Sequence, residues 1–324
     1  MSSYQLNVFK AASLLGRVVP LPVALGAARI LGSWFGPRLM PDKAEMLGRH
    51  LRRISRLSPS PVEARAADGF GSYARYWVES LRLPYLTDRV IDRGFSFVDY
   101  DRIEQVRADG RGPILVLPHL GGWEWAAAWL GRVGRVPVTA VVERLEPDDL
   151  FAWFGDLRGS WGVEVVPLGV DAFSRLTGAV ADRRIICLLA DRDVGETGVE
   201  VEFFGETTTL PVGPAVLSAR TGAPLLPTAV FFSGRQRFCR VGRPIEPDRF
   251  DDGPLGTRLR GRRRYQALTQ LLATEMERLI LDAPEQWHLL EPNWPSDRTG
   301  FAAPELNPGR RRTRPATVGE CESE

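Results

Sequence analysis

The sequence predicts an α/β fold in which a mixed, mostly parallel central sheet is flanked by helices. Between residues 114 and 190, short apolar runs alternate with longer helical patterns across short loops. Alternation of this kind is typical of strands that pair in parallel around crossover helices. The chain has 324 residues, 44% of them hydrophobic, which suffices for one large core. With no internal repeat, we expect a single domain over residues 1–303.

Residues 1–57 are predicted to be helical. Helices are expected over Gln5–Val18, Pro22–Phe35 and Pro41–Leu57, and the first two have large apolar faces with few charges. Scattered charges and prolines argue against a signal peptide and against a membrane-spanning helix. An apolar helix face of this kind serves either as a cap on a membrane surface or as a cover for the protein core, and its periodicity is the same in both cases.

The third of these helices carries a cluster of arginines at helical spacing. A solvated face is the ordinary interpretation, attraction to anionic lipid is the alternative, and we expect His50 at the surface among them. The next predicted helix, Val62–Leu81, carries aromatic residues that we expect in the core. The clustered arginines are Arg49, Arg52, Arg53 and Arg56.

The alternating region begins at Ile114–Leu117, an apolar run short enough for a buried strand. It continues through strands at Val136–Val142, Val163–Val166 and Ile185–Ala190, and helices at Trp123–Leu130, Asp148–Arg158 and Asp171–Ala181.

The second half of the chain mixes strands and helices. Val199–Phe204 alternates apolar and acidic residues and predicts a half-exposed strand. A helix over Pro214–Thr221, a hairpin of Leu225–Phe232 with Arg237–Val241, and a long amphipathic helix over Arg260–Leu281 follow. The composition of Pro304–Glu324 predicts a disordered tail.

Composition and cysteine spacing exclude several functions. A net charge of +2 does not favour bulk nucleic-acid binding. The three cysteines are widely spaced and form neither a metal-binding pattern nor a disulfide framework. We therefore expect a reducing compartment and no metal.

One junction concentrates the residues that carry chemistry. His119 follows the first predicted strand, Gly121 and Gly122 come next, and Glu124 stands at the start of a helix. The glycines would let a ligand approach the backbone, and Glu124 could orient the imidazole as the acid of a triad does. The segment contains neither Ser nor Cys, so we expect the nucleophile to arrive with the substrate as an alcohol.

These residues resemble a known family. HLGGWE at residues 119–124 is similar to the H-x-x-x-x-D/E motif of glycerolipid acyltransferases, with Glu where many members have Asp. The chain around it resembles the bacterial lipid A biosynthesis (lauroyl/myristoyl) acyltransferase family, and most closely its actinobacterial phosphatidylinositol mannoside branch. Three further segments carry the resemblance: ADRDVGETGVEVEFFGE, LPVGPAVLSARTGAPLLP and QWHLLEPNWPSDR.

The resemblance assigns roles to residues. It implies that His119 is a general base supported by Glu124, with a second acidic partner that is Asp191, Asp193 or Glu200. Substrate or phosphate contacts are implied for Glu143, Arg144, Arg158, Asp191 and Arg192, and a place in the pocket floor for Pro227. Any of these charged residues could equally be a solvated surface charge.

The implied reaction is transfer of a fatty acyl chain from acyl-CoA to a sugar hydroxyl of a mannosylated phosphatidylinositol. The resemblance implies no cofactor and no covalent acyl-enzyme. It also implies a peripheral place on the cytoplasmic face of the inner membrane. Three alternatives stay open: a lipid A precursor or lysophospholipid as acceptor, hydrolysis by activated water, and a non-catalytic lipid-binding homologue.

Overall fold

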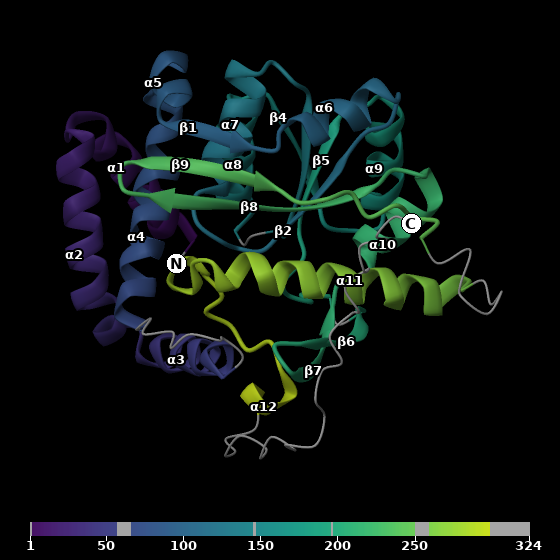
Figure 1. The fold of residues 1–324 in the computed structure, drawn as a ribbon. Coiled ribbons are helices and arrows are strands. Elements are labelled where there is room, and N and C mark those ends of the chain that lie inside the picture. Colours follow the sequence, from purple (N-terminus) through teal and green to yellow (C-terminus); the bar gives the residue numbers. More distant parts are fainter. Residues whose placement is uncertain (1, 57–65, 145–146, 196, 250–258, 299–324) are drawn as a thin grey trace, which may run out of the picture.

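The computed structural model describes residues 2–56, 66–144, 147–195, 197–249 and 259–298. Its centre is a seven-stranded sheet with strand order β1-β9-β8-β2-β5-β3-β4 (Figure 1). All neighbouring strands pair in parallel except β8 and β9, which form an antiparallel hairpin. The predicted α/β fold with a mixed, mostly parallel central sheet is confirmed. The strands are β1 Phe95–Val98, β2 Ile114–Leu117, β3 Val138–Val142, β4 Val163–Pro167, β5 Ile185–Leu189, β8 Leu225–Ser233 and β9 Gln236–Val241.

Helices cover both faces of this sheet. Ile114 and Val116 of β2 pack toward one face, with α9, α10 and α11, while Leu115 and Leu117 pack toward the other, with α5 to α8. A strand buried on both faces needs apolar residues at every position, which explains the continuous run in β2. The helices are α5 Asp88–Arg93, α6 Asp101–Ala108, α7 Trp123–Ala128, α8 Asp148–Gly159, α9 Ala172–Ala181, α10 Gly213–Thr221 and α11 Gly261–Leu281.

Four N-terminal helices lie at one end of the sheet (Figure 1). The second packs closely on the fourth, because a Cβ atom at Gly32 would lie only 2.7 Å from the Phe70 carbonyl oxygen. No helix among the described residues is long and apolar enough to span a bilayer. The four are α1 Ser2–Val18, α2 Leu21–Leu39, α3 Pro41–Ser55 and α4 Ala66–Arg82.

The structure corrects two local predictions on α3. His50 is buried instead of exposed, because Nδ1 contacts the Leu289 carbonyl oxygen and Nε2 contacts Asp297. Arg53 is also buried, where it pairs with Asp297. Helical periodicity cannot reveal a partner that lies more than two hundred residues away in the chain.

Several short elements were not predicted. They include α5, β1, the strand β7 Glu206–Leu210, which pairs with β6 Val199–Phe203, and the C-terminal turn of helix α12 Pro295–Arg298. A π-helix over Trp129–Val133 continues α7 beyond the predicted end at Leu130. The predicted tail Pro304–Glu324 and the start of the predicted helix at Val62 lie outside the described residues.

Candidate active site

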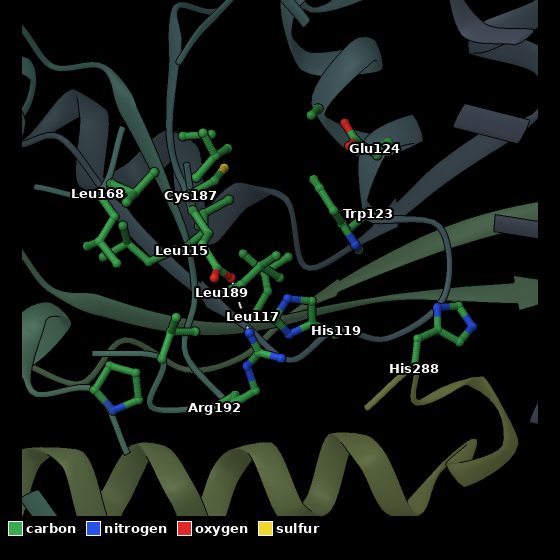
Figure 2. Close-up of a pocket in the computed structure, with 18 of the residues that line it drawn as sticks. Leu115, Leu117, His119, Trp123, Glu124, Leu168, Cys187, Leu189, Arg192 and His288 are labelled. Carbon is green, nitrogen blue, oxygen red and sulfur yellow. Dashed lines mark hydrogen bonds and ion pairs between the residues drawn. The ribbon is translucent and has the colours of Figure 1, made fainter. Parts of the chain in front are cut away.

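A cavity of about 720 Å³ runs from the carboxyl ends of β3 and β5 along the α7 face of the sheet. Its walls are mostly apolar. The polar side chains form two groups, one around His119 and Arg192 (Figure 2), which we call the polar end, and one at Glu124 and Arg158. In Figure 2, His119 lies between Leu117 on one side and His288 on the other. Apolar lining residues include Leu115, Ala126, Leu130, Ala140, Cys187 and Val230; polar ones include Lys43, His119, Glu143, Arg158, Arg192, Asp193, His288 and Glu291.

His119 is held by Asp191. The imidazole Nδ1 lies 2.6 Å from Asp191 Oδ1, and the His119 backbone N–H donates to Oδ2 of the same carboxylate at 2.9 Å. The side chain of His119 is 37% exposed, whereas that of Asp191 is fully buried. Because a carboxylate only accepts, Nδ1 carries the proton and Nε2 keeps its lone pair free for a substrate.

Asp191 is ionised in this setting. Burial alone would raise its pKa, but the charge of His119, hydrogen bonds from its side chain and from the Trp287 indole, and the His119 backbone N–H bring the pKa below the ordinary 3.8. A buried carboxylate beside an imidazole stabilises the imidazolium that forms when the imidazole accepts a proton.

Glu124, predicted to orient the imidazole, has other partners. Its Oε1 accepts hydrogen bonds from Arg158 Nη2 at 2.6 Å and Nε at 3.1 Å, and from the Tyr76 hydroxyl at 3.4 Å. In Figure 2, Glu124 lies apart from His119, beyond Trp123. The carboxylate that contacts the imidazole is therefore Asp191, one of the three candidates for the second acidic partner.

Gly121 has a different use from the one predicted. Its φ is +60°, and a Cβ atom there would lie 2.0 Å from the carbonyl oxygen of Val230 in β8. A Cβ atom at Gly122 would lie 2.7 Å from the Phe232 ring. Both glycines let the loop pack on β8, and this close contact fixes the position of His119.

Three predicted residues lie at the polar end of the cavity as a group. Arg192 Nη2 lies 3.1 Å from Glu143 Oε2, and both side chains line the cavity. Figure 2 shows Arg192 close to His119. Asp193 also lines it, and its Oδ2 accepts the Gly198 backbone N–H at 2.8 Å, which closes the loop after β5. Charged groups beside an apolar cavity suit an amphipathic substrate.

Asp191, predicted also as a substrate contact, is fully buried behind His119 and does not line the cavity, and neither do three further predicted residues. Arg144 is exposed and pairs with Asp148 four residues later. Glu200 is exposed on β6 and lies outside the lining, so it is not the acidic partner of His119. Pro227 is buried inside β8 opposite Val116 and does not form the cavity floor.

His288 and Trp287 were not assigned roles from the sequence, although both belong to a quoted motif. His288 lines the cavity, and its Nε2 lies 2.9 Å from Ser72 Oγ. Burial and then the charge of His119 lower the pKa of His288 to about 3, so this imidazole is neutral. The sequence offered no signal for these roles, because His288 lies beside His119 only in the folded structure and the spacing of the two residues in the chain does not indicate it.

No group of three or more His, Cys, Asp or Glu side chains among the described residues is arranged to hold a metal ion.

Comparison with known proteins identifies the class of enzyme. The protein with this buried aspartate, imidazole and apolar cavity is a lipid acyltransferase. The chain belongs to the bacterial lipid A biosynthesis acyltransferase family, whose model matches residues 8–296.

Two relatives share most of the chain. It is similar to a phosphatidylinositol mannoside acyltransferase of Mycobacterium tuberculosis (strain ATCC 25618 / H37Rv), with 38% identity over 260 residues covering 78% of each chain. It is also similar to the protein of the same name from Mycolicibacterium smegmatis (strain ATCC 700084 / mc(2)155). In that case the identity is 37% over 257 residues, covering 78% of this chain and 80% of the relative.

Proposed function

We propose that this protein transfers a fatty acyl chain from acyl-CoA to a sugar hydroxyl of a phosphatidylinositol mannoside glycolipid. The observation that carries the proposal is the His119–Asp191 pair at the polar end of an apolar cavity. Two relatives named for activity on phosphatidylinositol mannoside support the choice of acceptor.

In the proposed mechanism, His119 acts as the general base. Nε2 takes the proton from the acceptor hydroxyl as the oxygen attacks the thioester carbonyl, and Asp191 stabilises the imidazolium that results. The imidazolium then donates this proton to the departing thiolate of CoA. Backbone N–H groups at the start of α7, or Arg192 on the cavity wall, would stabilise the tetrahedral oxyanion.

No covalent acyl-enzyme forms in this proposal. The thiols of Cys187 and Cys239 line the cavity beside the strands, and burial raises the pKa of both. Burial raises the pKa of Cys187 to about 12, and a thiol of that pKa does not supply the thiolate that acyl transfer needs. This supports direct attack by the acceptor alcohol.

The apolar part of the cavity would hold the acyl chain. The volume of the whole cavity, about 720 Å³, falls within the range of about 300–1,000 Å³ that is typical of small-molecule sites. Each methylene group moved there from water contributes about 0.8 kcal/mol to binding. The headgroup of the acceptor would lie at the polar end, near Lys43, Arg192 and Glu291.

Association with the cytoplasmic face of the membrane is part of the proposal. α2 exposes apolar side chains along one face, and Met40, which follows it, is 39% exposed and also lines the cavity. Such a helix lies in the lipid interface with its apolar face buried, which would bring acceptor lipid to the cavity. The exposed apolar residues of α2 are Val23, Ile30, Leu31, Trp34, Phe35 and Leu39.

The deciding experiment measures acyl transfer by the His119→Ala variant with palmitoyl-CoA. The acceptor panel contains a phosphatidylinositol mannoside, a lipid A precursor and a lysophospholipid. We expect transfer to the mannoside in the wild type and loss of nearly all of it in the variant, with circular dichroism unchanged. Unchanged turnover by His119→Ala would refute the general-base role. Fatty acid release without acceptor would identify a hydrolase, and wild-type transfer to another acceptor alone would replace the substrate.

A further inference from the structure

The C-terminal segment Gln286–Asp297 lies against the loop that carries His119. The His288 backbone N–H donates to the His119 carbonyl oxygen at 2.8 Å, and the Gly121 N–H donates to the Gln286 carbonyl oxygen at 2.9 Å. Leu120 and Trp287 form an antiparallel bridge between the two stretches. The segment is therefore part of the framework of the site.

One side chain of this segment reaches the carboxylate behind the imidazole. The indole N–H of Trp287 donates to Asp191 Oδ2 at 2.7 Å, and the Trp287 side chain is fully buried. Asn293 Nδ2 donates to the backbone carbonyl of Asp191 at 2.9 Å. Asp191 is thus held at its side chain and at its backbone by the same segment.

We propose that Trp287 is a positioning residue for acyl transfer, whose indole N–H fixes Oδ2 of Asp191 so that Oδ1 stays aligned with Nδ1 of His119. The inference rests on the proposed function, in which His119 is the general base. Without the indole, Oδ2 would keep only the His119 backbone N–H as a partner. A buried carboxylate that loses one of its donors reorients to recover hydrogen bonds, and Oδ1 then leaves the imidazole.

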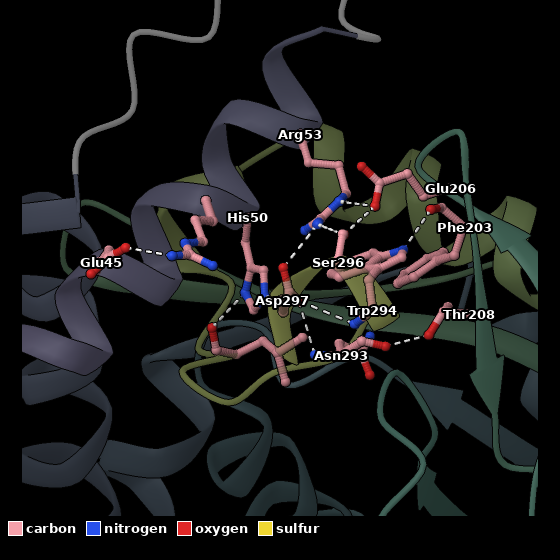
Figure 3. Close-up of polar contacts among 12 residues, drawn as sticks. Glu45, His50, Arg53, Phe203, Glu206, Thr208, Asn293, Trp294, Ser296 and Asp297 are labelled. Carbon is pink, nitrogen blue, oxygen red and sulfur yellow. Dashed lines mark hydrogen bonds and ion pairs between the residues drawn. The ribbon is translucent and has the colours of Figure 1, made fainter. Parts of the chain in front are cut away.

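The far end of the segment is anchored, which makes a fixed indole possible. Asp297 accepts hydrogen bonds from Arg53 Nη2 at 2.9 Å and from the backbone N–H of Asn293 at 3.0 Å, and it contacts His50 at 3.2 Å (Figure 3). These contacts hold the pKa of Asp297 well below its ordinary range, although burial opposes the shift.

A second tryptophan of the segment packs on this anchor. The guanidinium carbon Cζ of Arg53 lies over the Trp294 ring, 3.9 Å from the ring centroid. The Trp294 indole N–H donates to the Phe203 carbonyl oxygen at 3.1 Å. The segment is tied to α3 through Asp297, and to the β6–β7 hairpin through Trp294 and through the Thr208 hydroxyl, which donates to the Asn293 carbonyl oxygen. Loss of the Trp294 N–H alone therefore leaves a tie to each element in place.

The chain offers a matched control for a test. Trp287 and Trp294 are both buried, belong to the same segment and donate one indole N–H each, but only Trp287 donates to Asp191. We expect Trp287→Phe to lower kcat by about 10- to 100-fold, as small displacements of reacting groups do, with KM changed by no more than about twofold. Trp294→Phe should change kcat by no more than about threefold.

The second readout is the tautomer of His119 in the free protein. The sequence has three histidines, so ¹⁵N-histidine spectra are simple to assign with His50→Gln and His288→Gln variants. We expect neutral wild-type His119 to carry its proton on Nδ1, Trp287→Phe to show a mixture of tautomers, and Trp294→Phe to match the wild type.

If Trp287→Phe does not fold, benzothienylalanine at position 287 replaces the N–H by sulfur at nearly constant volume, and the same two measurements apply. The inference requires both changes. A wild-type tautomer or a kcat no lower than that of Trp294→Phe overturns it. Failure of the proposed function is a separate result, namely unchanged turnover in His119→Ala, and the tautomer measurement does not depend on turnover.

Discussion

Nδ1 of His119 lies 2.6 Å from Oδ1 of Asp191, although 72 positions separate the two residues in the chain. The pair forms because β2 and β5 are parallel neighbours in the sheet, with Leu117 opposite Leu189. Both residues follow the carboxyl end of their strand, where ligands of open α/β sheets bind. The pairing of β2 with β5, and not proximity in sequence, brings His119 and Asp191 together.

Asp191→Asn should remove most of the activity. An amide cannot stabilise the imidazolium, and its NH₂ group favours the wrong imidazole tautomer, so we expect kcat to fall by about 10³- to 10⁴-fold. Steady-state acyl transfer measures the effect. Glu200→Gln, on an exposed face of β6, is the control and should keep wild-type kcat; equal losses in both variants would contradict the assignment of Asp191.

Removal of one partner of the buried Glu124–Arg158 pair should destabilise the protein more than removal of both partners. Arg158 is largely buried, and its pKa lies above the ordinary value because the adjacent Glu124 outweighs the effect of burial. Glu124→Leu leaves this guanidinium unpaired, and we expect a loss of about 3–5 kcal/mol in the free energy of unfolding.

The double variant Glu124→Leu, Arg158→Met should recover much of this loss, because it removes both charges together. Urea unfolding measures all variants. Arg144→Ala, which breaks an exposed pair with Asp148, should cost less than about 1 kcal/mol. A double variant no more stable than Glu124→Leu would show that the cost lies in packing.

His288 should make the protein sensitive to mild acid. Its folded pKa is lowered from 6.5 to about 3, so the unfolded chain binds this proton first as the pH falls. Stability from the neutral imidazole is present above pH 6.5 and is lost toward about pH 3, with a slope of up to about 1.4 kcal/mol per pH unit.

The measurement is urea unfolding of the wild type and His288→Gln between about pH 7 and about pH 5. We expect a weaker pH dependence in the variant, since glutamine can bond to Ser72 but does not titrate. The lowered pKa values of Asp191 and Asp297 affect stability only below about pH 4, outside this range. Identical slopes in the two proteins would contradict the prediction.

Ala127 on α7 lines the cavity and should control which acyl chains fit. Ala127→Leu fills part of the space, and each methylene displaced into water costs about 0.8 kcal/mol, or about fourfold in kcat/KM. We expect palmitoyl-CoA to lose more activity than octanoyl-CoA. Ala181→Leu, at an exposed position on α9, should leave the ratio of the two donors unchanged. Equal losses for both donors would mean that the chain binds elsewhere.

Periodicity was sufficient for most of the fold. Burial on both faces makes β2 and β5 continuously apolar, and β6 alternates because only one of its faces is buried, so these strands could be predicted from local pattern. β1 was not predicted because its four residues contain a polar exposed position and lack the length that distinguishes a strand from a loop.

The site itself was only partly predictable. His119 could be identified because it stands at a strand–helix junction, which is a local feature. Its partner could not, since Glu124 is closer in sequence but its carboxylate pairs with Arg158 of α8. The contributions of Trp287 and His288 depend on how the C-terminal segment returns across the sheet, which no local pattern encodes.

The return of Gln286–Asp297 to the loop of His119 also has a consequence for synthesis. A nascent chain that ends before Trp287 contains β2 and the four N-terminal helices, but it lacks the indole and amide donors that hold Asp191. The hydrogen bonds that hold Asp191 beside His119 can therefore be completed only after the C-terminal segment has been synthesised. We expect the site to become fully ordered last, after most of the sheet has been translated.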